Sequence, residues 1–155
     1  MKNVLIAVDE TKATKDIFNK CITICKCMNP DLIMLVYVER YEGRSLMTAM
    51  LQDESELATL KEVLEGTDYK EALDKKAETI LTYYKNILEE KPPRPRVETI
   101  VRIGHPADEI LGAAKDKNAD IILIGSAGKR VSHLFMGSVS REVVNRAEIP
   151  VLVVR

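Results

Sequence analysis

The sequence predicts an α/β fold in which helices cover both faces of a parallel sheet. Five short apolar runs alternate with segments of helical periodicity, and the connections are long enough to hold helices. Parallel strands need such crossover connections, which are right-handed almost without exception. The length of 155 residues suits one domain, and 46% hydrophobic against 30% charged residues is typical of a folded chain.

Three of the five predicted strands are continuous apolar runs, as expected for strands covered on both faces. These runs are Val4–Val8, Leu32–Val38 and Ile121–Ile124, and a fourth apolar run, Val151–Val154, begins after Pro150. The remaining run, Val97–Ile103, alternates, with Glu98, Ile100 and Arg102 on one side. This half-polar pattern predicts a strand at an edge of the sheet.

The helices are predicted from apolar stripes and from capping signals. The first helix follows the first strand, with Thr11 or Thr14 as its cap and Asn29–Pro30 as its end. Its stripe recurs at three- and four-residue steps and consists of Ile17, Phe18, Cys21, Cys25 and Met28. Asp68 and Glu71 indicate a capping box for a second helix, over about Tyr69–Glu90. Two more helices are expected, one beginning at Pro106 and one capped by Ser138.

The connection from Glu39 to Pro95 is the least regular part of the chain. Ser45–Glu65 also has helical periodicity, and Gly66 would end that helix. We therefore expect one domain over residues 1–155, with a helical insertion at about residues 40–66. The insertion could cover a crevice at the strand ends or extend a dimer contact, and the sequence does not decide between the two.

Charge and hydropathy exclude several classes of protein. Lys and Arg number 23 against 24 Asp and Glu, a formal net charge of −1. No positive excess exists to attract nucleic acid or an anionic membrane. No apolar stretch approaches the length of a membrane span, and Val4–Val8 is too short for a signal peptide. We expect a cytoplasmic protein with neither nucleic-acid nor membrane partners.

Cys21, Cys25 and Cys27 fit neither a disulfide framework nor a common zinc pattern. We interpret them as free thiols on the first helix, in a reducing compartment. A regulatory pair of Cys21 and Cys25, one helical turn apart, stays open.

Glycines after the fourth strand have the spacing of a phosphate-binding site. Gly125-Ser126-Ala127-Gly128 is followed, after eight residues, by Gly137-Ser138 at the start of a helix. The glycines let the backbone approach a ligand, and a helix N-terminus offers unpaired N–H groups to phosphate oxygens. Lys129 adds a positive charge, although glycine turns and a serine cap also occur without any ligand. Neither a P-loop nor a G-x-G-x-x-G motif is present.

These segments resemble the universal stress protein family. The resemblance covers "NVLIAVDE", "LIMLVYVE", "VRIGHPADEI" and, most specifically, "ADIILIGSAGKRVSHLFMGSVSREVVNRAEIPVLVVR". It implies a single-domain, Rossmann-like open sheet of five parallel strands in the order 3-2-1-4-5. It also implies ATP or AMP as the ligand, with which a Mg²⁺ ion could bind.

The resemblance further implies which residues contact the nucleotide. Ala7 and Val38 would flank the base, Asp9 would hold the adenine or ribose side, and Lys129 would be a weaker contact. Asp9 could instead cap the following helix. The whole implied set is Ala7, Asp9, Val38, Ile124, Gly125, Gly128, Lys129, Gly137, Ser138, Val139 and Ser140.

The phosphate loop departs from the family pattern by one residue. The ATP-binding branch has nine residues before the last glycine, whereas eight separate Gly128 from Gly137 here. The missing residue falls where the outer phosphates would bind. A nucleotide-binding regulator of the stress response is therefore expected, and a slow ATPase or a nucleotide-free dimeric interaction module are the alternatives.

The sequence predicts neither catalytic residues nor a protein-bound metal, and it predicts self-association. No group of acidic residues follows the first or fourth strand in the way that nucleotide hydrolysis requires, so we expect no catalytic residues and no protein-bound metal. His105 and His133 are interpreted as ordinary surface residues because neither has an identifiable partner. Val151–Val154 should be an apolar edge strand, which predicts a homodimer, whereas the downstream protein partner stays unknown.

Overall fold

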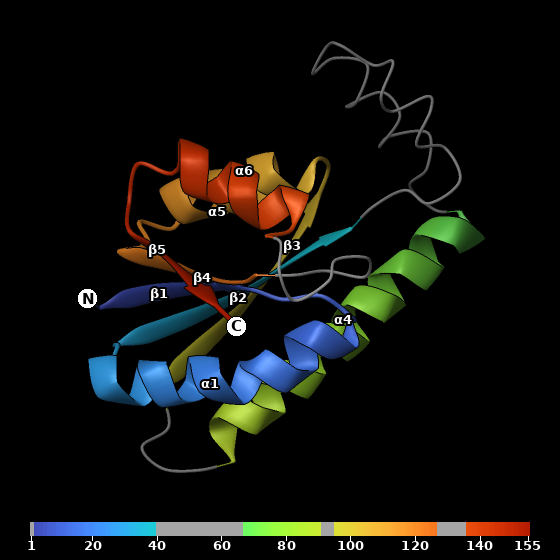
Figure 1. Ribbon diagram of the computed structural model, residues 1–155. Helices are drawn as coiled ribbons and strands as arrows, with labels where there is room; N and C mark the ends of the chain where they lie inside the picture. Colours follow the sequence, from blue (N-terminus) through green and yellow to red (C-terminus); the bar gives the residue numbers. More distant parts are fainter. Residues whose placement is uncertain (1, 40–66, 91–94, 127–135) are drawn as a thin grey trace.

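The computed structural model describes residues 2–39, 67–90, 95–126 and 136–155 (Figure 1). Five strands form one sheet in the order β3-β2-β1-β4-β5, and every neighbouring pair is parallel. The bounds are β1 Asn3–Ala7, β2 Leu32–Glu39, β3 Arg96–Ile103, β4 Ile121–Gly125 and β5 Val151–Val154. The predicted fold class and strand order are confirmed.

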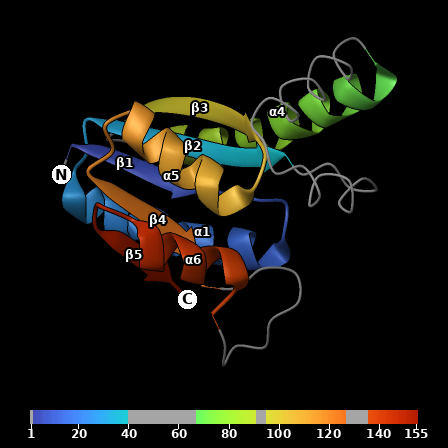
Figure 2. The ribbon, with the colours of Figure 1, turned by 90° about the horizontal axis from the view of Figure 1, so that it is seen from above.

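Four described helices cover the two faces of this sheet (Figures 1 and 2). One face carries α1 and α4, and the other carries α5 and α6. The bounds are α1 Lys12–Met28, α4 Asp68–Glu89, α5 Pro106–Asp116 and α6 Ser138–Arg146. Among the described helices, none combines the length and apolarity that crossing a membrane would need. The predicted insertion at residues 40–66 lies outside the described residues.

Two apolar clusters hold the layers together. On the α1/α4 side, the ring centroids of Phe18 and Tyr84 lie 4.4 Å apart, and both side chains are fully buried. On the other side, Leu5 packs with Ile110 of α5 and Val143 of α6. Because β1 and β4 are central strands, both of their faces are covered, which explains their unbroken apolar sequence.

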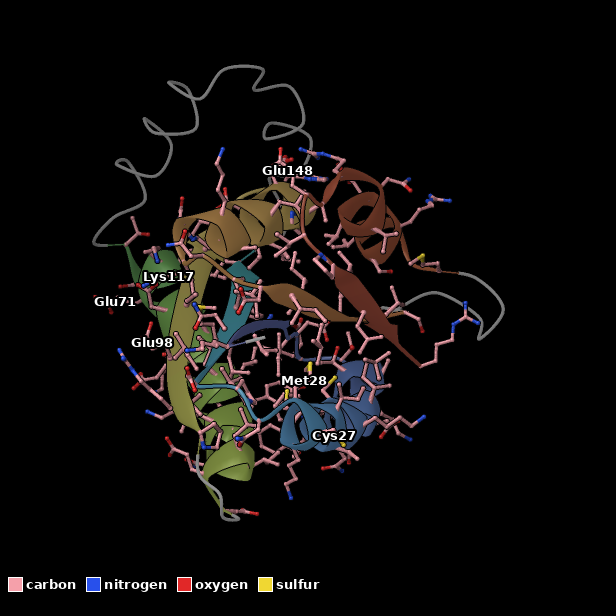
Figure 3. All side chains as sticks on the ribbon, turned by 90° about the vertical axis from the view of Figure 1, so that its left-hand side faces the viewer. Cys27, Met28, Glu71, Glu98, Lys117 and Glu148 are labelled. Carbon is pink, nitrogen blue, oxygen red and sulfur yellow. The ribbon has the colours of Figure 1, made fainter. Side chains whose placement is uncertain are left out.

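The two edge strands are less covered than the central ones, as the half-polar sequence of β3 predicts. Val101 of β3 is 44% exposed, and Leu152 of β5 is 36% exposed. On the half-polar side of β3, Ile100 is buried, and Glu98 lies 3.7 Å from Lys117 Nζ, at the end of α5 (Figure 3). Polar residues at this edge therefore make ion pairs rather than core contacts.

The helix caps confirm one prediction and correct two. Thr11 caps α1, and Asn29 ends it in the left-handed conformation. The cap of α4 is Thr67, whose side chain accepts from Lys70 N–H at 3.3 Å, whereas Asp68 lies inside the first turn. The cap of α6 is Gly137, and Ser138 is the first helical residue. The prediction was one residue late in both cases, because threonine and glycine are also acceptable caps.

All three cysteines are free, as predicted. Cys21 and Cys25 are buried in α1, and desolvation raises the pKa of Cys21 to about 11 and that of Cys25 to about 12. Cys27 is the exposed thiol (Figure 3). Since the thiolate is the reactive form, burial argues against a regulatory pair of Cys21 and Cys25.

The connection from β1 to α1 is held from two sides. Asp9 Oδ1 accepts hydrogen bonds from Thr11 N–H at 2.8 Å and from the hydroxyls of Thr11 and Thr14, both at 2.6 Å. On α4, the Tyr84 hydroxyl donates to the Asp9 carbonyl at 2.9 Å. The end of β1 is thus fixed by a residue 75 positions away in the sequence.

Replacing Tyr84 by Phe should lower the free energy of unfolding by about 1–2 kcal/mol, since the Asp9 carbonyl loses a buried donor. Tyr83→Phe is the matched control, because Tyr83 is 46% exposed and keeps its ring contact with Tyr84 in the variant. Urea unfolding of the three proteins measures the difference. Equal losses in both variants would contradict the role given to the Tyr84 hydroxyl.

Candidate functional site

The carboxyl ends of β1 and β4 form the point where the direction of winding reverses. The strands are neighbours, with Ile6 opposite Leu123, yet β1 leads to α1 on one face and β4 leads towards α6 on the other (Figure 1). In open parallel sheets, ligands bind outside the strand ends at such a reversal. The residues that follow β1 and precede α6 are therefore the ones to examine.

The start of α6 is fixed against the end of β4. Gly137 N–H donates to the Ser126 carbonyl at 2.7 Å, and the Ser140 hydroxyl donates to the carbonyls of Gly137 at 3.1 Å and Ser126 at 3.3 Å. Ser126 N–H in turn donates to the Val154 carbonyl at 2.9 Å. The Gly137 amide and the Ser140 hydroxyl are thus engaged within the protein.

The first-turn amides of α6 are the donors that remain. Arg141 N–H bonds back to the Gly137 carbonyl at 3.0 Å, which closes the first helical turn. No side chain caps this end of α6 among the described residues. The N–H groups of Ser138, Val139 and Ser140 therefore carry the positive end of the helix dipole, an arrangement that favours an anion.

An apolar surface accompanies these donors. Ala7, Val38 and Val139 are half-buried and pack against the cluster between the sheet and α5/α6, to which the buried Ile124 also belongs. The four residues come from the ends of β1, β2 and β4 and from α6, so the sheet brings four sequence-predicted residues to one face. Aliphatic side chains at strand ends suit the flat, weakly polar face of a base.

Asp9 follows β1 at the carboxyl end of the sheet, where its side chain has a structural role. Its Oδ1 accepts the three hydrogen bonds that organise the start of α1. Among the described residues, no hydrogen bond to its Oδ2 is found. The N-cap of α1 is Thr11 rather than Asp9, whose Oδ1 supports that cap, and the predicted contact of Asp9 with a nucleotide stays a prediction for its other oxygen.

The remaining predicted residues are only partly described. Gly125 is the last residue of β4, opposite Val154 of β5. Gly128 and Lys129 lie outside the described residues, and so does His133. The predicted contacts of these three residues with phosphate stay predictions.

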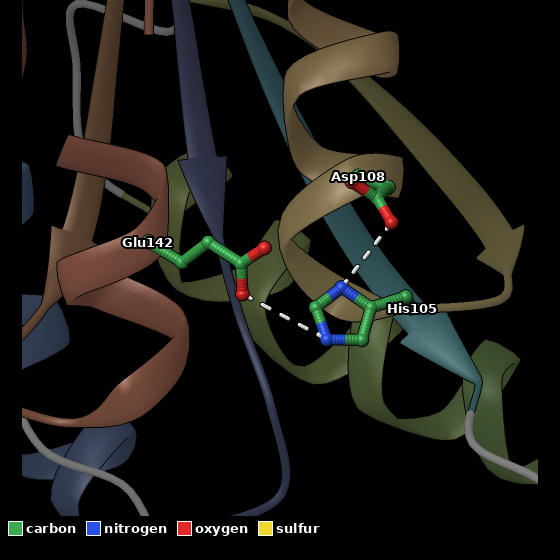
Figure 4. Close-up of side chains that lie close together, drawn as sticks. All are labelled: His105, Asp108 and Glu142. Atoms are coloured by element: carbon green, nitrogen blue, oxygen red, sulfur yellow. Dashed lines mark ion pairs between the residues drawn. The ribbon is translucent and has the colours of Figure 1, made fainter. Parts of the chain in front are cut away.

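A cluster that sequence reasoning missed lies where α5 meets α6 (Figure 4). His105 Nδ1 is 3.3 Å from Asp108 Oδ2, and His105 Nε2 is 3.8 Å from Glu142 Oε2. Arg146 Nη1 lies 2.7 Å from an oxygen of each carboxylate, and its hydrogen bonds to Asp108 and Glu142 raise its pKa. His105 is 55% exposed, as predicted for a surface residue, but it does have partners.

Gly104 places His105 at the start of α5. The φ angle of Gly104, +150°, is one that other residues rarely adopt. A Cβ atom added at this position would also lie only 2.7 Å from Glu109 Oε1. His105 then becomes the N-cap of α5, although its side chain makes no capping bond. The contact between His105 and Asp108 could have been predicted from their spacing of three residues. The contact between His105 and Glu142 could not, because it depends on how two helices pack.

The first curated proteins that match do so over part of the chain, with moderate identity. Universal stress protein MJ0577 of Methanocaldococcus jannaschii is 39% identical over 61 residues, which are 39% of this chain and 38% of that protein. The chain spans 38–45% of the length of the first relatives that it matches.

Comparison with solved structures extends over nearly the whole chain. The match to the structure of MJ0577 has a TM-score of 0.74 at 25% identity and covers 99% of this chain and 94% of that one. A universal stress protein of Archaeoglobus fulgidus in complex with dAMP has a TM-score of 0.63 at 16% identity, covering 100% and 98% of the two chains. A universal stress protein in complex with cAMP has a TM-score of 0.64 at 15% identity, covering 99% and 96%. At these low identities, the two complexes show that the fold is shared.

A family model settles the relationship. The model described as the universal stress protein family matches residues 1–155, which is the whole length of the chain. This match agrees with the observed strand order and with the sequence motifs at the ends of β1 and β4. The chain belongs to the universal stress protein family.

Proposed function

We propose that this protein binds an adenine nucleotide, ATP or AMP, at the carboxyl ends of β1 and β4 and acts as a regulator in the stress response. The observation that carries the proposal is the first turn of α6, whose amides have no side-chain cap among the described residues and are held beside the end of β4. The phosphate next to the ribose would accept hydrogen bonds from Ser138, Val139 and Ser140.

The base and the ribose find suitable groups nearby. Ala7 and Val38 would flank the base, because both are apolar, half-buried and on the same face as Val139. Asp9 Oδ2 would accept a hydrogen bond from a ribose hydroxyl while Oδ1 continues to organise α1. The complexes of family members with dAMP and cAMP support an adenine nucleotide as the class of ligand.

The nucleotide that we expect to bind best carries a single phosphate group. The spacing between Gly128 and Gly137 is one residue shorter than in the ATP-binding pattern, and this difference affects the outer phosphates. Gly128 and Lys129 would complete the phosphate contacts. A Mg²⁺ ion would bind mainly to the phosphates of ATP, since Asp9 Oδ1 already accepts the hydrogen bonds that organise α1.

Binding without rapid turnover is the activity that these contacts favour. The acids that follow β1 already have structural partners: Asp9 organises α1, and Glu10 lies 3.2 Å from Lys76 Nζ. Phosphoryl transfer needs acidic groups that hold a metal ion and position a water molecule. A slow ATPase is the alternative that the same site would allow.

Ser138→Asp should weaken AMP binding at least about tenfold, because a carboxylate at the first turn repels phosphate from the same amides. The same substitution should not lower the thermal midpoint, since an acid is favourable at a helix N-terminus. Isothermal titration with AMP measures the affinity.

The matched control is Asn145→Asp, which adds a negative charge to an exposed position in the last turn of α6. AMP affinity that is the same in Ser138→Asp as in the original protein would contradict the proposed site. Steady phosphate release from ATP that Ser138→Asp abolishes would favour the slow ATPase instead.

We also propose that the protein forms a homodimer through β5. The strand lies at one edge of the sheet and pairs only with β4 among the described strands. Its Val151 and Val153 are half-buried, and Leu152 is 36% exposed. A short apolar edge strand of this kind can pair with a second copy about a two-fold axis.

Leu152→Lys should convert the dimer into a monomer, because a charge on the apolar edge opposes pairing. Val101→Lys is the control, since Val101 is similarly exposed on the opposite edge strand, β3. Sedimentation equilibrium at micromolar concentration distinguishes the two masses. A monomeric mass for the original protein would refute the dimer.

A further inference from the structure

One imidazole and two carboxylates come together where α5 packs against α6 (Figure 4). Each of His105, Asp108 and Glu142 offers a ligand atom, and these atoms lie within 4.8 Å of one another. Imidazole nitrogen together with carboxylate oxygen is a donor set for divalent transition metals. We propose that His105, Asp108 and Glu142 form a binding site for a divalent cation of the zinc type.

The three side chains are near enough to bind one metal ion after side-chain rotation. Ligand atoms about 2.1 Å from a tetrahedral zinc ion are about 3.4 Å apart. His105 Nδ1 lies 3.3 Å from Asp108 Oδ2, and His105 Nε2 lies 3.8 Å from Glu142 Oε2. A single ion can bind only one of these two nitrogens, so one carboxylate would have to rotate towards it; one ligand atom of each residue already lies within 4.8 Å of the others. Such rotation is open to Asp108 and Glu142, whose side chains are 51% and 35% exposed.

The charge around the cluster provides an independent argument. Asp108 and Glu142, which come from different helices, already converge on one cation, because Arg146 Nη1 lies 2.7 Å from an oxygen of each. Arg146 carries one positive charge and therefore balances only one of the two negative charges of these carboxylates. A divalent ion would therefore compete with the Arg146 guanidinium, which is about half exposed and can withdraw into solvent.

The cysteine thiols could also bind added zinc, so their binding must be distinguished from binding at this site. Cys21 and Cys25 are buried, and desolvation raises their pKa values well above neutrality, so both resist ionisation. Cys27 is exposed and could bind zinc by itself. A Cys27→Ser background removes this competing donor without affecting α5 or α6.

The test is calorimetric titration of Zn²⁺ into untagged, EDTA-treated protein in that background, without nucleotide. We expect one site, weakened at least about tenfold in His105→Asn and in Glu142→Gln, because even the loss of an indirect ligand contact costs about that much. Arg146→Gln should tighten binding about two- to fivefold, as removal of the competing ion pairs implies.

Matched variants make the result specific. Glu148→Gln removes an exposed acid beyond the end of α6 (Figure 3), Arg141→Gln removes an exposed arginine from the same helix, and His133→Asn removes the other histidine. These three variants should bind Zn²⁺ like their parent. The proposal is overturned if the Cys27→Ser protein binds no Zn²⁺, if His105→Asn binds it equally well, or if Arg146→Gln and Arg141→Gln have the same affinity. None of these outcomes depends on nucleotide binding.

Discussion

The hydrogen bond from Gly137 N–H to the Ser126 carbonyl holds the first turn of α6 against the end of β4. Because this bond and the Ser140 hydroxyl occupy the Ser126 carbonyl, the helix begins at a defined position beside the sheet. The amides of the first turn are then presented at the strand ends rather than to bulk solvent on a free helix. The proposed nucleotide site, and the position of Glu142 one turn further along α6, both depend on this attachment.

Opposite this helix, the end of β1 is organised by a second set of polar contacts. Asp9 links β1 to α1 through Thr11 and Thr14, and the Tyr84 hydroxyl links the Asp9 carbonyl to α4. The family resemblance by itself predicts that Asp9 contacts a ligand. In the structure, its Oδ1 accepts hydrogen bonds from Thr11 and Thr14 that stabilise the start of α1. A residue near a binding site can serve stability and recognition together when its two oxygens have separate partners.

Much of the fold was predictable because its strongest signals are local. Continuous apolar runs identified the central strands, alternation identified β3 as an edge, and family motifs supplied the strand order. The caps of α4 and α6 were misplaced by one residue, since Thr67 and Gly137 compete with equally suitable neighbours. Ala7, Val38 and Val139 were predicted to lie together, and they share one face. The contact of His105 with Glu142 was not predictable, because it joins two helices whose packing no local pattern specifies.

The central claim is that the first-turn amides of α6 receive a nucleotide phosphate, and a ¹H–¹⁵N NMR titration tests it most directly. With AMP, the amide signals of Ser138, Val139 and Ser140 should shift strongly, together with that of Ala7. With adenosine, which lacks the phosphate, the Ala7 signal should still shift, while the three α6 signals should move much less. Unchanged α6 amide signals at saturating AMP would contradict the account.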